Sequence, residues 1–193
     1  MSHSSKCKYI INCSRAVTKI RIAKATATLK AMDKIWRSKA IKMETKMKVI
    51  QTCIFSVVLY GCESWVVTND IEQKILAFEI KCYRKILRID WTQKVTNMEL
   101  YTRIGLKENI MQKLIRRKLG VFGHICRMKD DRKIKTLMFG RMEETNRRWR
   151  PQREWLEDVI GWGRTSLQEL RHTAMVRERW RNLVKMAADT YGS

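Results

Sequence analysis

The sequence predicts a mainly α-helical protein, a helical bundle of about four to five amphipathic helices with a small C-terminal helical unit. Its 193 residues include a single proline and only eight glycines, so few positions would interrupt a helix. Lys, Arg, Ala, Leu, Met and Glu are plentiful, and these residue types favour helices over sheet. Hydrophobic residues make up 45% of the chain, which permits a core, and a chain of this length should bury about 70% of its unfolded surface.

The net charge predicts a polyanionic partner. The chain has 41 Lys and Arg against 19 Asp and Glu, a formal charge of +22 and a pI of about 10.1. A merely soluble basic surface is the alternative, but so large an excess repels itself in the compact state unless counter-charge arrives. We therefore expect nucleic acid as the partner.

The chain is expected to have four parts. Residues 1–14 are polar apart from residues 9–11, so they should form an N-terminal tail or a short strand. Residues 15–129 carry the longest amphipathic patterns and should form one helical domain. Residues 130–152 are polar and charged, as in a basic linker, and residues 153–187 should form the C-terminal helical unit.

The most apolar stretch, residues 54–65, predicts the centre of the core. It ends a helix whose earlier residues are apolar on one face, whereas Phe55 and Val58 fill other faces as well. Gly61 is well placed to end this helix. Before it, a first helix is expected over about residues 15–37.

The clearest amphipathic helix is expected over about residues 70–89. Asn69 can cap it, and Glu72 follows three residues later as in a capping box. An apolar stripe begins at Ile71 and ends at Ile89. The opposite stripe consists of cations that we expect to contact nucleic acid, namely Lys74, Lys81, Arg84, Lys85 and Arg88.

Another long helix is expected over about residues 108–128. Its apolar face includes Leu114 and Phe122, and its far face carries glycines between cations, in the order Lys113, Arg116, Gly120, Gly123 and Arg127. Each glycine costs about 1 kcal/mol relative to alanine in a helix interior, so something should approach closely there. The sequence leaves two candidates open: a sugar-phosphate backbone and a packed neighbouring helix.

A third candidate contact lies before the C-terminal unit, where an aromatic residue is surrounded by cations. This arrangement suits stacking on a base with phosphates nearby. Its residues are Arg147, Arg148, Trp149, Arg150 and Arg153. Thr96 with Glu99 and Ser166 with Glu169 predict the starts of two shorter helices.

The six cysteines include no Cys-x-x-Cys pair and are expected to be reduced thiols of an intracellular protein. His124 and Cys126 lie close in sequence, but their spacing matches no standard zinc finger or knuckle. We expect no metal site. Secretion and membrane insertion are not expected either, since no apolar stretch approaches the ~20 residues that a span needs.

Five sequence blocks resemble one protein family, in the same order. They are LYGCESW (59–65), AFEIKCYRKIL (77–87), RKLGVFGHICRM (117–128), RPQREW (150–155) and RERWR (177–181). These blocks resemble the C-terminal region of reverse transcriptases of non-LTR (LINE-like) retrotransposons, whose patterns are LYGxExW, AFExKCxRRxL, RKLxxFGHxxRM, GRPRxxW and DRxRWR. The resemblance spans roughly residues 9–185.

The resemblance implies a helical thumb that grips the primer–template duplex by its backbone, as part of an RNA-directed DNA polymerase encoded by a transposable element. The catalytic palm, the fingers and the endonuclease would lie upstream of residue 1. The chain has no Tyr-x-Asp-Asp hairpin, and Asp130 and Asp131 lie between basic residues, as in a solvated loop. We therefore expect no enzyme activity of its own and no cofactor, with Mg²⁺ only in the missing palm.

The expected partner is an RNA–DNA hybrid, RNA or DNA, with upstream reverse transcriptase domains as a further candidate, and the expected location is the nucleus. Two other functions stay open. One is a helical protein–protein adaptor whose basic faces meet acidic partners. The other is a relic of a retroelement with no selected function.

Overall fold

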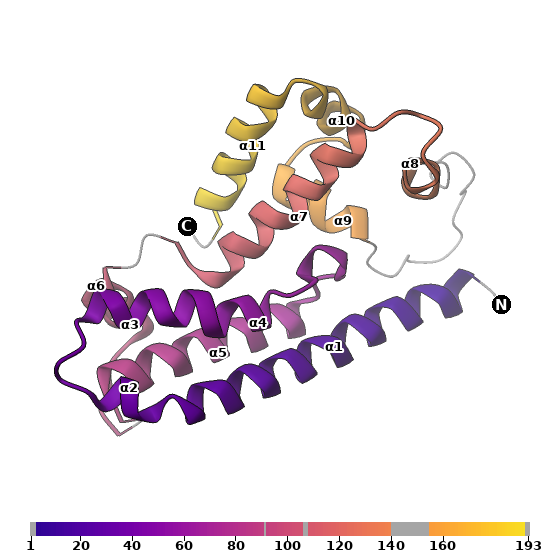
Figure 1. Cartoon of the computed structure of the whole chain (residues 1–193). Coiled ribbons are helices and arrows are strands. Elements are labelled where there is room, and N and C mark those ends of the chain that lie inside the picture. Colours follow the sequence, from indigo (N-terminus) through magenta and orange to yellow (C-terminus); the bar gives the residue numbers. More distant parts are fainter. Residues whose placement is uncertain (1–2, 91, 106–107, 140–154, 192–193) are drawn as a thin grey trace. The chain divides into compact units, whose positions relative to one another are not determined.

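The computed structural model describes residues 3–90, 92–105, 108–139 and 155–191, and all regular structure in these ranges is helical (Figure 1). The predicted fold class is therefore confirmed. The chain divides into two compact units. Unit 1 comprises Met1–Ile11, Glu63–Val66 and Gln112–Ser193, and unit 2 comprises Asn12–Cys62 and Val67–Met111.

The first helix is longer than expected. Helix α1 (His3–Ala31) includes most of the residues for which we expected a tail or a short strand. No glycine or proline interrupts the sequence from residue 3 to residue 31, so the helix continues. A break at Met32 separates it from α2 (Asp33–Arg37), so the expected helix over 15–37 is two helices.

The central apolar helix of unit 2 is built from three segments. Helix α3 (Met43–Val49) continues into a π-helix (Ile50–Phe55) and then α4 (Ser56–Val58), where we had expected one regular helix. The side chains of Ile54, Phe55, Val58 and Leu59 are all buried, so this apolar stretch contributes to the core of unit 2. Gly61 follows with a left-handed φ of +72°, as expected of the residue that ends the helix.

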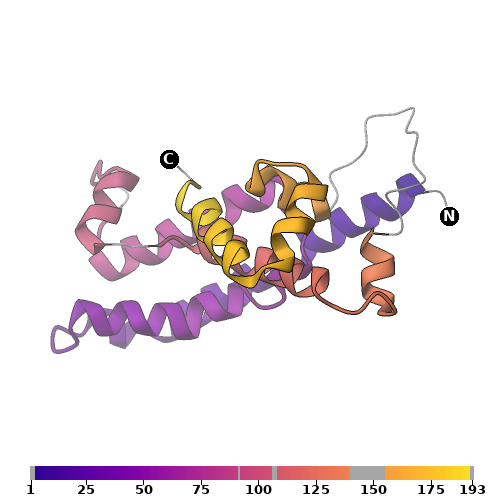
Figure 2. The same cartoon turned by 90° about the horizontal axis from the view of Figure 1, so that it is seen from above.

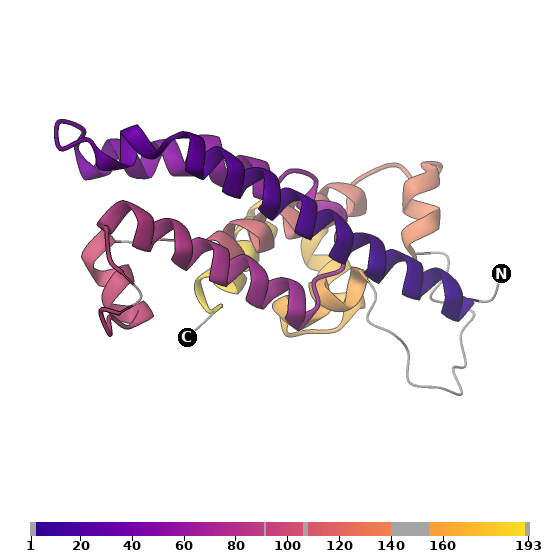
Figure 3. The ribbon, with the colours of Figure 1, turned by 90° about the horizontal axis from the view of Figure 1, so that it is seen from below.

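Helix α5 (Asn69–Leu87) buries the predicted apolar stripe. Its cap is Thr68 rather than Asn69, since the Thr68 hydroxyl accepts a hydrogen bond from the Ile71 N–H at 3.4 Å. Thr68 has the extended conformation that an N-cap needs, whereas Asn69 is already helical. Within unit 2, α1, α3–α4 and α5 lie alongside one another (Figures 1 and 3).

Helix α6 (Asn97–Ile104) has the predicted start. The Thr96 hydroxyl accepts a hydrogen bond from the Glu99 N–H, and Gly105 adopts a left-handed conformation after the last turn.

Glu79 on α5 is wholly buried and accepts hydrogen bonds from the Tyr83 hydroxyl at 2.8 Å and from the Ile110 N–H at 2.9 Å. A carboxylate therefore holds the first residue of the next helix against α5.

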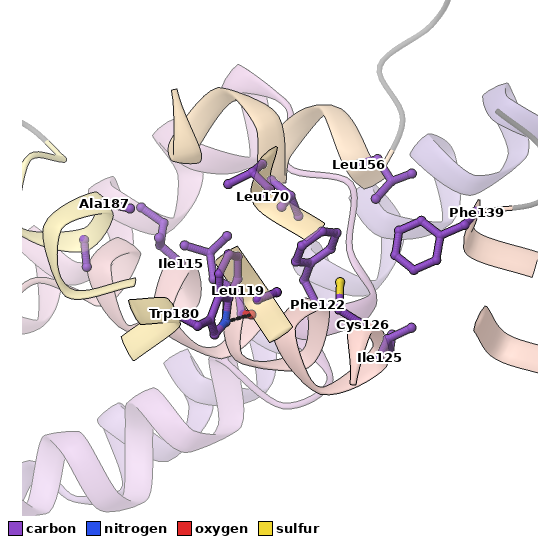
Figure 4. Close-up of a cluster of buried hydrophobic side chains, with 13 residues drawn as sticks. Ile115, Leu119, Phe122, Ile125, Cys126, Phe139, Leu156, Leu170, Trp180 and Ala187 are labelled. Carbon is purple, nitrogen blue, oxygen red and sulfur yellow. Dashed lines mark hydrogen bonds between the residues drawn. The ribbon is translucent and has the colours of Figure 1, made fainter. Parts of the chain in front are cut away.

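Unit 1 is built on α7 (Ile110–Cys126), α8 (Lys133–Phe139) and three C-terminal helices, which follow one another in Figure 2: α9 (Trp155–Gly163), α10 (Leu167–Met175) and α11 (Arg177–Asp189). Their buried apolar side chains form one cluster (Figure 4). The last boundary between the units falls after Met111, whereas we expected a boundary in 130–152. The reason is that the apolar face of α7 packs with the C-terminal helices.

Part of the expected linker is helical and contributes to this core. Helix α8 lies within 130–152, and its Phe139 ring contacts the Phe122 ring edge-to-face, with centroids 6.0 Å apart. The remainder of that range, 140–152, lies outside the described residues. Ser166 caps α10 by accepting from the Glu169 N–H, as predicted. In the part of the chain that the structure describes, no helix is both long enough and apolar enough to cross a bilayer.

Candidate nucleic-acid interface

Four of the five predicted cations of α5 line one cleft in unit 2. The cleft has a volume of about 610 Å³ and lies between α5 and the end of α1 with α2. Its described lining includes six cations: Lys30, Arg37, Lys81, Arg84, Lys85 and Arg88. We call this feature the basic cleft. Because Asp33 and Asp90 are its acidic residues, positive charge is in excess there.

The C-terminal end of α5 shapes one wall of the basic cleft. Arg88 adopts a left-handed φ of 54° as the C-cap of α5, and its guanidinium donates a hydrogen bond to the Arg37 carbonyl. Arg84 donates to the Val95 carbonyl at 2.7 Å. A carbonyl accepts the hydrogen bond without neutralising the guanidinium, so both side chains keep their positive charge in a fixed place.

The opposite wall is anchored by a buried tryptophan. Trp36 on α2 is 1% exposed, and its indole N–H donates to the Leu29 carbonyl at 2.8 Å. The Lys46 ammonium, also buried, donates to the carbonyls of Trp36 and Ser38 at 2.9 and 2.7 Å. These contacts hold α2 in position, and with it Arg37.

Asp33 neutralises part of the cleft. Its carboxylate forms ion pairs with Arg37 on its own helix and with Lys85 on α5, both with N–O distances of 2.5 Å. The hydrogen bond from Lys85 is the main reason that the pKa of Asp33 lies below its usual value. Asp33 is therefore ionised at neutral pH. Lys81, by contrast, is exposed and forms no ion pair with any residue that the structure describes.

The fifth predicted cation of α5, Lys74, does not line the cleft. Its ammonium forms an ion pair with Asp70 one turn earlier, at 2.6 Å. Asp70 also pairs with Arg15 of α1 at 3.1 Å, and the hydrogen bond from Lys74 is the main cause of its lowered pKa. Lys74 therefore belongs to a contact between α1 and α5 at the other end of α5.

Part of the glycine-and-cation stripe of α7 packs against neighbouring helices of unit 1. A Cβ at Gly123 would overlap the indole of Trp180 on α11, so a packed helix is what approaches this glycine. Arg127 donates to the Ala174 carbonyl at 2.6 Å. Gly120 faces open space, where a Cβ would meet nothing within 4 Å.

Two further cations of this stripe are partly enclosed. Arg116 forms an ion pair with Asp189 of α11 at 2.8 Å, and Lys113 is half-buried. These α7 cations belong to unit 1, whereas the residues that line the basic cleft belong to unit 2. The loop candidates Arg147, Arg148, Trp149, Arg150 and Arg153 lie outside the described residues.

Two contributors to the basic cleft were missing from the predicted set, namely Lys30 and Arg37. Their spacing of seven residues placed them on one side of the first helical stretch, but nothing in the sequence said which helix would face them. Asp33 was also missed. Its position four residues before Arg37 is the signal that could have suggested an ion pair.

No group of three or more His, Cys, Asp or Glu residues that could hold a metal ion occurs among the described residues. His124 is exposed, whereas Cys126 is buried in the core cluster. Asp130, the first of the adjacent aspartates, forms an ion pair with Lys135 at 2.7 Å and is otherwise open to solvent.

Six cations around one cleft are an arrangement that can bind an anion. Comparisons of the chain with family models, with curated proteins and with solved structures found no match.

Proposed function

We propose that this chain is a nucleic-acid-binding fragment, the thumb and C-terminal region of a non-LTR retrotransposon reverse transcriptase without the catalytic palm. The five sequence blocks support the family, and the basic cleft supports the binding. In this proposal the chain grips an RNA–DNA hybrid or DNA by its backbone. Upstream polymerase domains, where they occur, would supply the chemistry, and the site of action would be the nucleus.

The observation that carries the binding proposal is the concentration of cations around one concave surface. Six cations and two carboxylates are among the described residues that line the basic cleft. Neutralising phosphates with Lys and Arg releases condensed counterions, and this release drives most non-specific binding to nucleic acid. Contacts to phosphates carry no sequence information, so we expect affinity with little sequence preference.

The test is the affinity of the purified chain for a fluorescent RNA–DNA hybrid, measured across a salt series. We expect tight binding at low salt and a loss of about 10³-fold or more between ~50 and ~200 mM salt, as for several phosphate contacts. Replacing Lys81, Arg84, Lys85 and Arg88 by Gln should weaken binding. It should also make the slope of log affinity against log salt less negative by about 3 to 4, because up to four phosphate contacts are lost.

A matched control removes the same charge elsewhere in unit 2. Lys24, Lys39, Lys48 and Lys94 are exposed and lie outside the basic cleft, so their replacement by Gln should reduce affinity much less. Equal losses in the two quadruple variants would mean that net charge, not the cleft, determines binding. Binding with little salt dependence would favour a protein–protein adaptor, and absence of binding at low salt would contradict the proposal.

A further inference from the structure

Two cations of the basic cleft converge on a single carboxylate. Each oxygen of Asp33 has its own partner: Arg37 Nε lies 2.5 Å from Oδ2, and Lys85 Nζ lies 2.5 Å from Oδ1. Arg37 comes from α2 and Lys85 from α5, so the two cations approach from opposite walls.

A phosphate group could make the same contacts. A phosphodiester presents two anionic oxygens on one atom, much as a carboxylate does, and guanidinium and ammonium groups bind both kinds of anion by charge-assisted hydrogen bonds. Arg37 is 75% exposed and Lys85 is 39% exposed, so an anion from solution can reach both cations. The Asp33 carboxylate is 28% exposed and thus the more enclosed partner.

We propose that Arg37 and Lys85 form a phosphate subsite of the basic cleft, and that Asp33 occupies this subsite in the free protein as an internal competitor. Asp33 is displaced when a backbone phosphate binds. The inference rests on the proposed nucleic-acid binding and adds to it a residue that weakens binding. Asp33 therefore limits the affinity of the cleft for any phosphate backbone.

The other described cations of the cleft have no such competitor. Arg84 and Arg88 donate to backbone carbonyls, which leave their charge in place. Lys30 and Lys81 are exposed and pair with no carboxylate among the described residues. Removing the charge of Asp33 should therefore change the cleft at one defined position.

The first experiment compares Asp33→Asn with Asp70→Asn in the hybrid-binding assay. Asp70 is a close control because it also holds two cations, Lys74 and Arg15, but lies outside the cleft. We expect Asp33→Asn to bind the hybrid about three- to tenfold more tightly at ~100 mM salt, with a salt slope steeper by up to about 1. Asp70→Asn should change the affinity less than about twofold, because its cations contact no phosphate in the cleft.

A second set of variants tests the subsite even if circular dichroism shows that Asp33→Asn does not fold. The double variant Arg37→Gln, Lys85→Gln should bind more weakly, with a salt slope flatter by about 2, because two phosphate contacts are lost. Adding Asp33→Asn to this double variant should restore little affinity, since the competitor no longer has a subsite to block.

The outcomes separate the inference from the proposed function. If the wild-type chain binds through the basic cleft but Asp33→Asn binds no more tightly than wild type or Asp70→Asn, the competitor is rejected and the binding proposal stands. An unchanged salt slope in the double variant would reject the subsite. If the wild-type chain does not bind the hybrid, both proposals fall together.

Discussion

Lys118 on α7 and Asp158 on α9 form an ion pair from which water is completely excluded, since neither side chain is exposed to solvent. The Lys118 ammonium also donates to the Trp65 carbonyl at 2.6 Å. It lies 4.7 Å from the ring centroid of Trp155 and 5.6 Å from that of Trp162. A buried charge is tolerated only when it is paired and hydrogen-bonded, and this cluster provides both.

Breaking this pair on one side should destabilise unit 1 strongly. Lys118→Met leaves Asp158 buried without its cation, and removing one partner of a buried pair costs about 3 to 5 kcal/mol. Asp158→Leu, which leaves the Lys118 cation buried without its carboxylate, should also destabilise the protein. Urea denaturation followed by tryptophan fluorescence measures the change in the free energy of unfolding.

The double variant Lys118→Met, Asp158→Leu is the control. Replacing both charges by apolar groups of similar volume is often nearly neutral, so the double variant should be more stable than Lys118→Met alone. A double variant whose cost equals the sum of the two single costs would show that the two charges do not depend on each other.

The same cluster gives physical roles to residues that the sequence offered only as markers of a resemblance. Trp65, Lys118 and Trp155 come from three of the five blocks. The Trp155 indole N–H donates to the Glu63 carbonyl at 2.6 Å. From the last block, the Trp180 indole N–H donates to the Leu119 carbonyl at 3.1 Å (Figure 4). These residue types are needed for packing within unit 1, whatever the chain binds.

The two glycines of α7 have different surroundings, so the same substitution should have opposite effects. Gly123→Ala should destabilise the protein by about 1 to 3 kcal/mol, because the new methyl group overlaps the Trp180 indole and overpacks the core. Gly120→Ala should stabilise it by up to about 1 kcal/mol, since its Cβ meets nothing and alanine favours the helix.

Thermal unfolding of these two variants against wild type measures both effects. Each variant is the other's control, because both add one methyl group to the same helix. Destabilisation by Gly120→Ala would mean that something approaches this exposed face of α7. An unchanged Gly123→Ala would mean that the contact with Trp180 does not contribute to stability.

Local patterns in the sequence were enough to predict helices and several of their ends. The apolar stripe of α5, the cap at Thr96 and the left-handed Gly105 all depend on near neighbours in the chain. The misplaced cap of α5 shows the limit of this approach, since Thr68 and Asn69 are both good capping residues at adjacent positions.

The candidate site was only partly predictable because it depends on which helices face each other. Periodicity placed Lys81 and Lys85 on one face of α5, but it could not show that Asp33 and Arg37 of α2 lie opposite. It also could not distinguish a helix packed on Gly123 from a phosphate backbone. Both questions concern tertiary contacts, which single-helix patterns do not contain.

The raised pKa values of Tyr101 and Tyr83 should make the free energy of unfolding of unit 2 fall at alkaline pH. The pKa of Tyr101 is raised from 10.0 to about 12, mainly by burial of the hydroxyl and next by the nearby charge of Glu79. The same two causes raise the pKa of Tyr83 well above its usual range. In the folded chain these hydroxyls therefore keep their protons at pH values where the unfolded chain has lost them.

The sign of the effect follows from proton linkage. Between pH 10 and pH 12 the unfolded state binds fewer protons at Tyr101 than the folded state, so the free energy of unfolding falls as pH rises. The contribution is complete below pH 10 and is lost as the pH passes the folded pKa near 12. Urea denaturation at a series of alkaline pH values measures this decline, and Tyr101→Phe should reduce it.

Glu79→Gln tests the carboxylate itself, because Gln keeps an oxygen that can accept from the Ile110 N–H but carries no charge. In this variant the pKa of Tyr101 should fall below about 12 yet stay above 10.0, since burial, the larger cause, is unchanged. Titration by the ultraviolet absorbance of tyrosinate measures the shift, with Tyr101→Phe identifying the signal. A Tyr101 pKa that does not move in Glu79→Gln would mean that burial alone holds the proton on this hydroxyl.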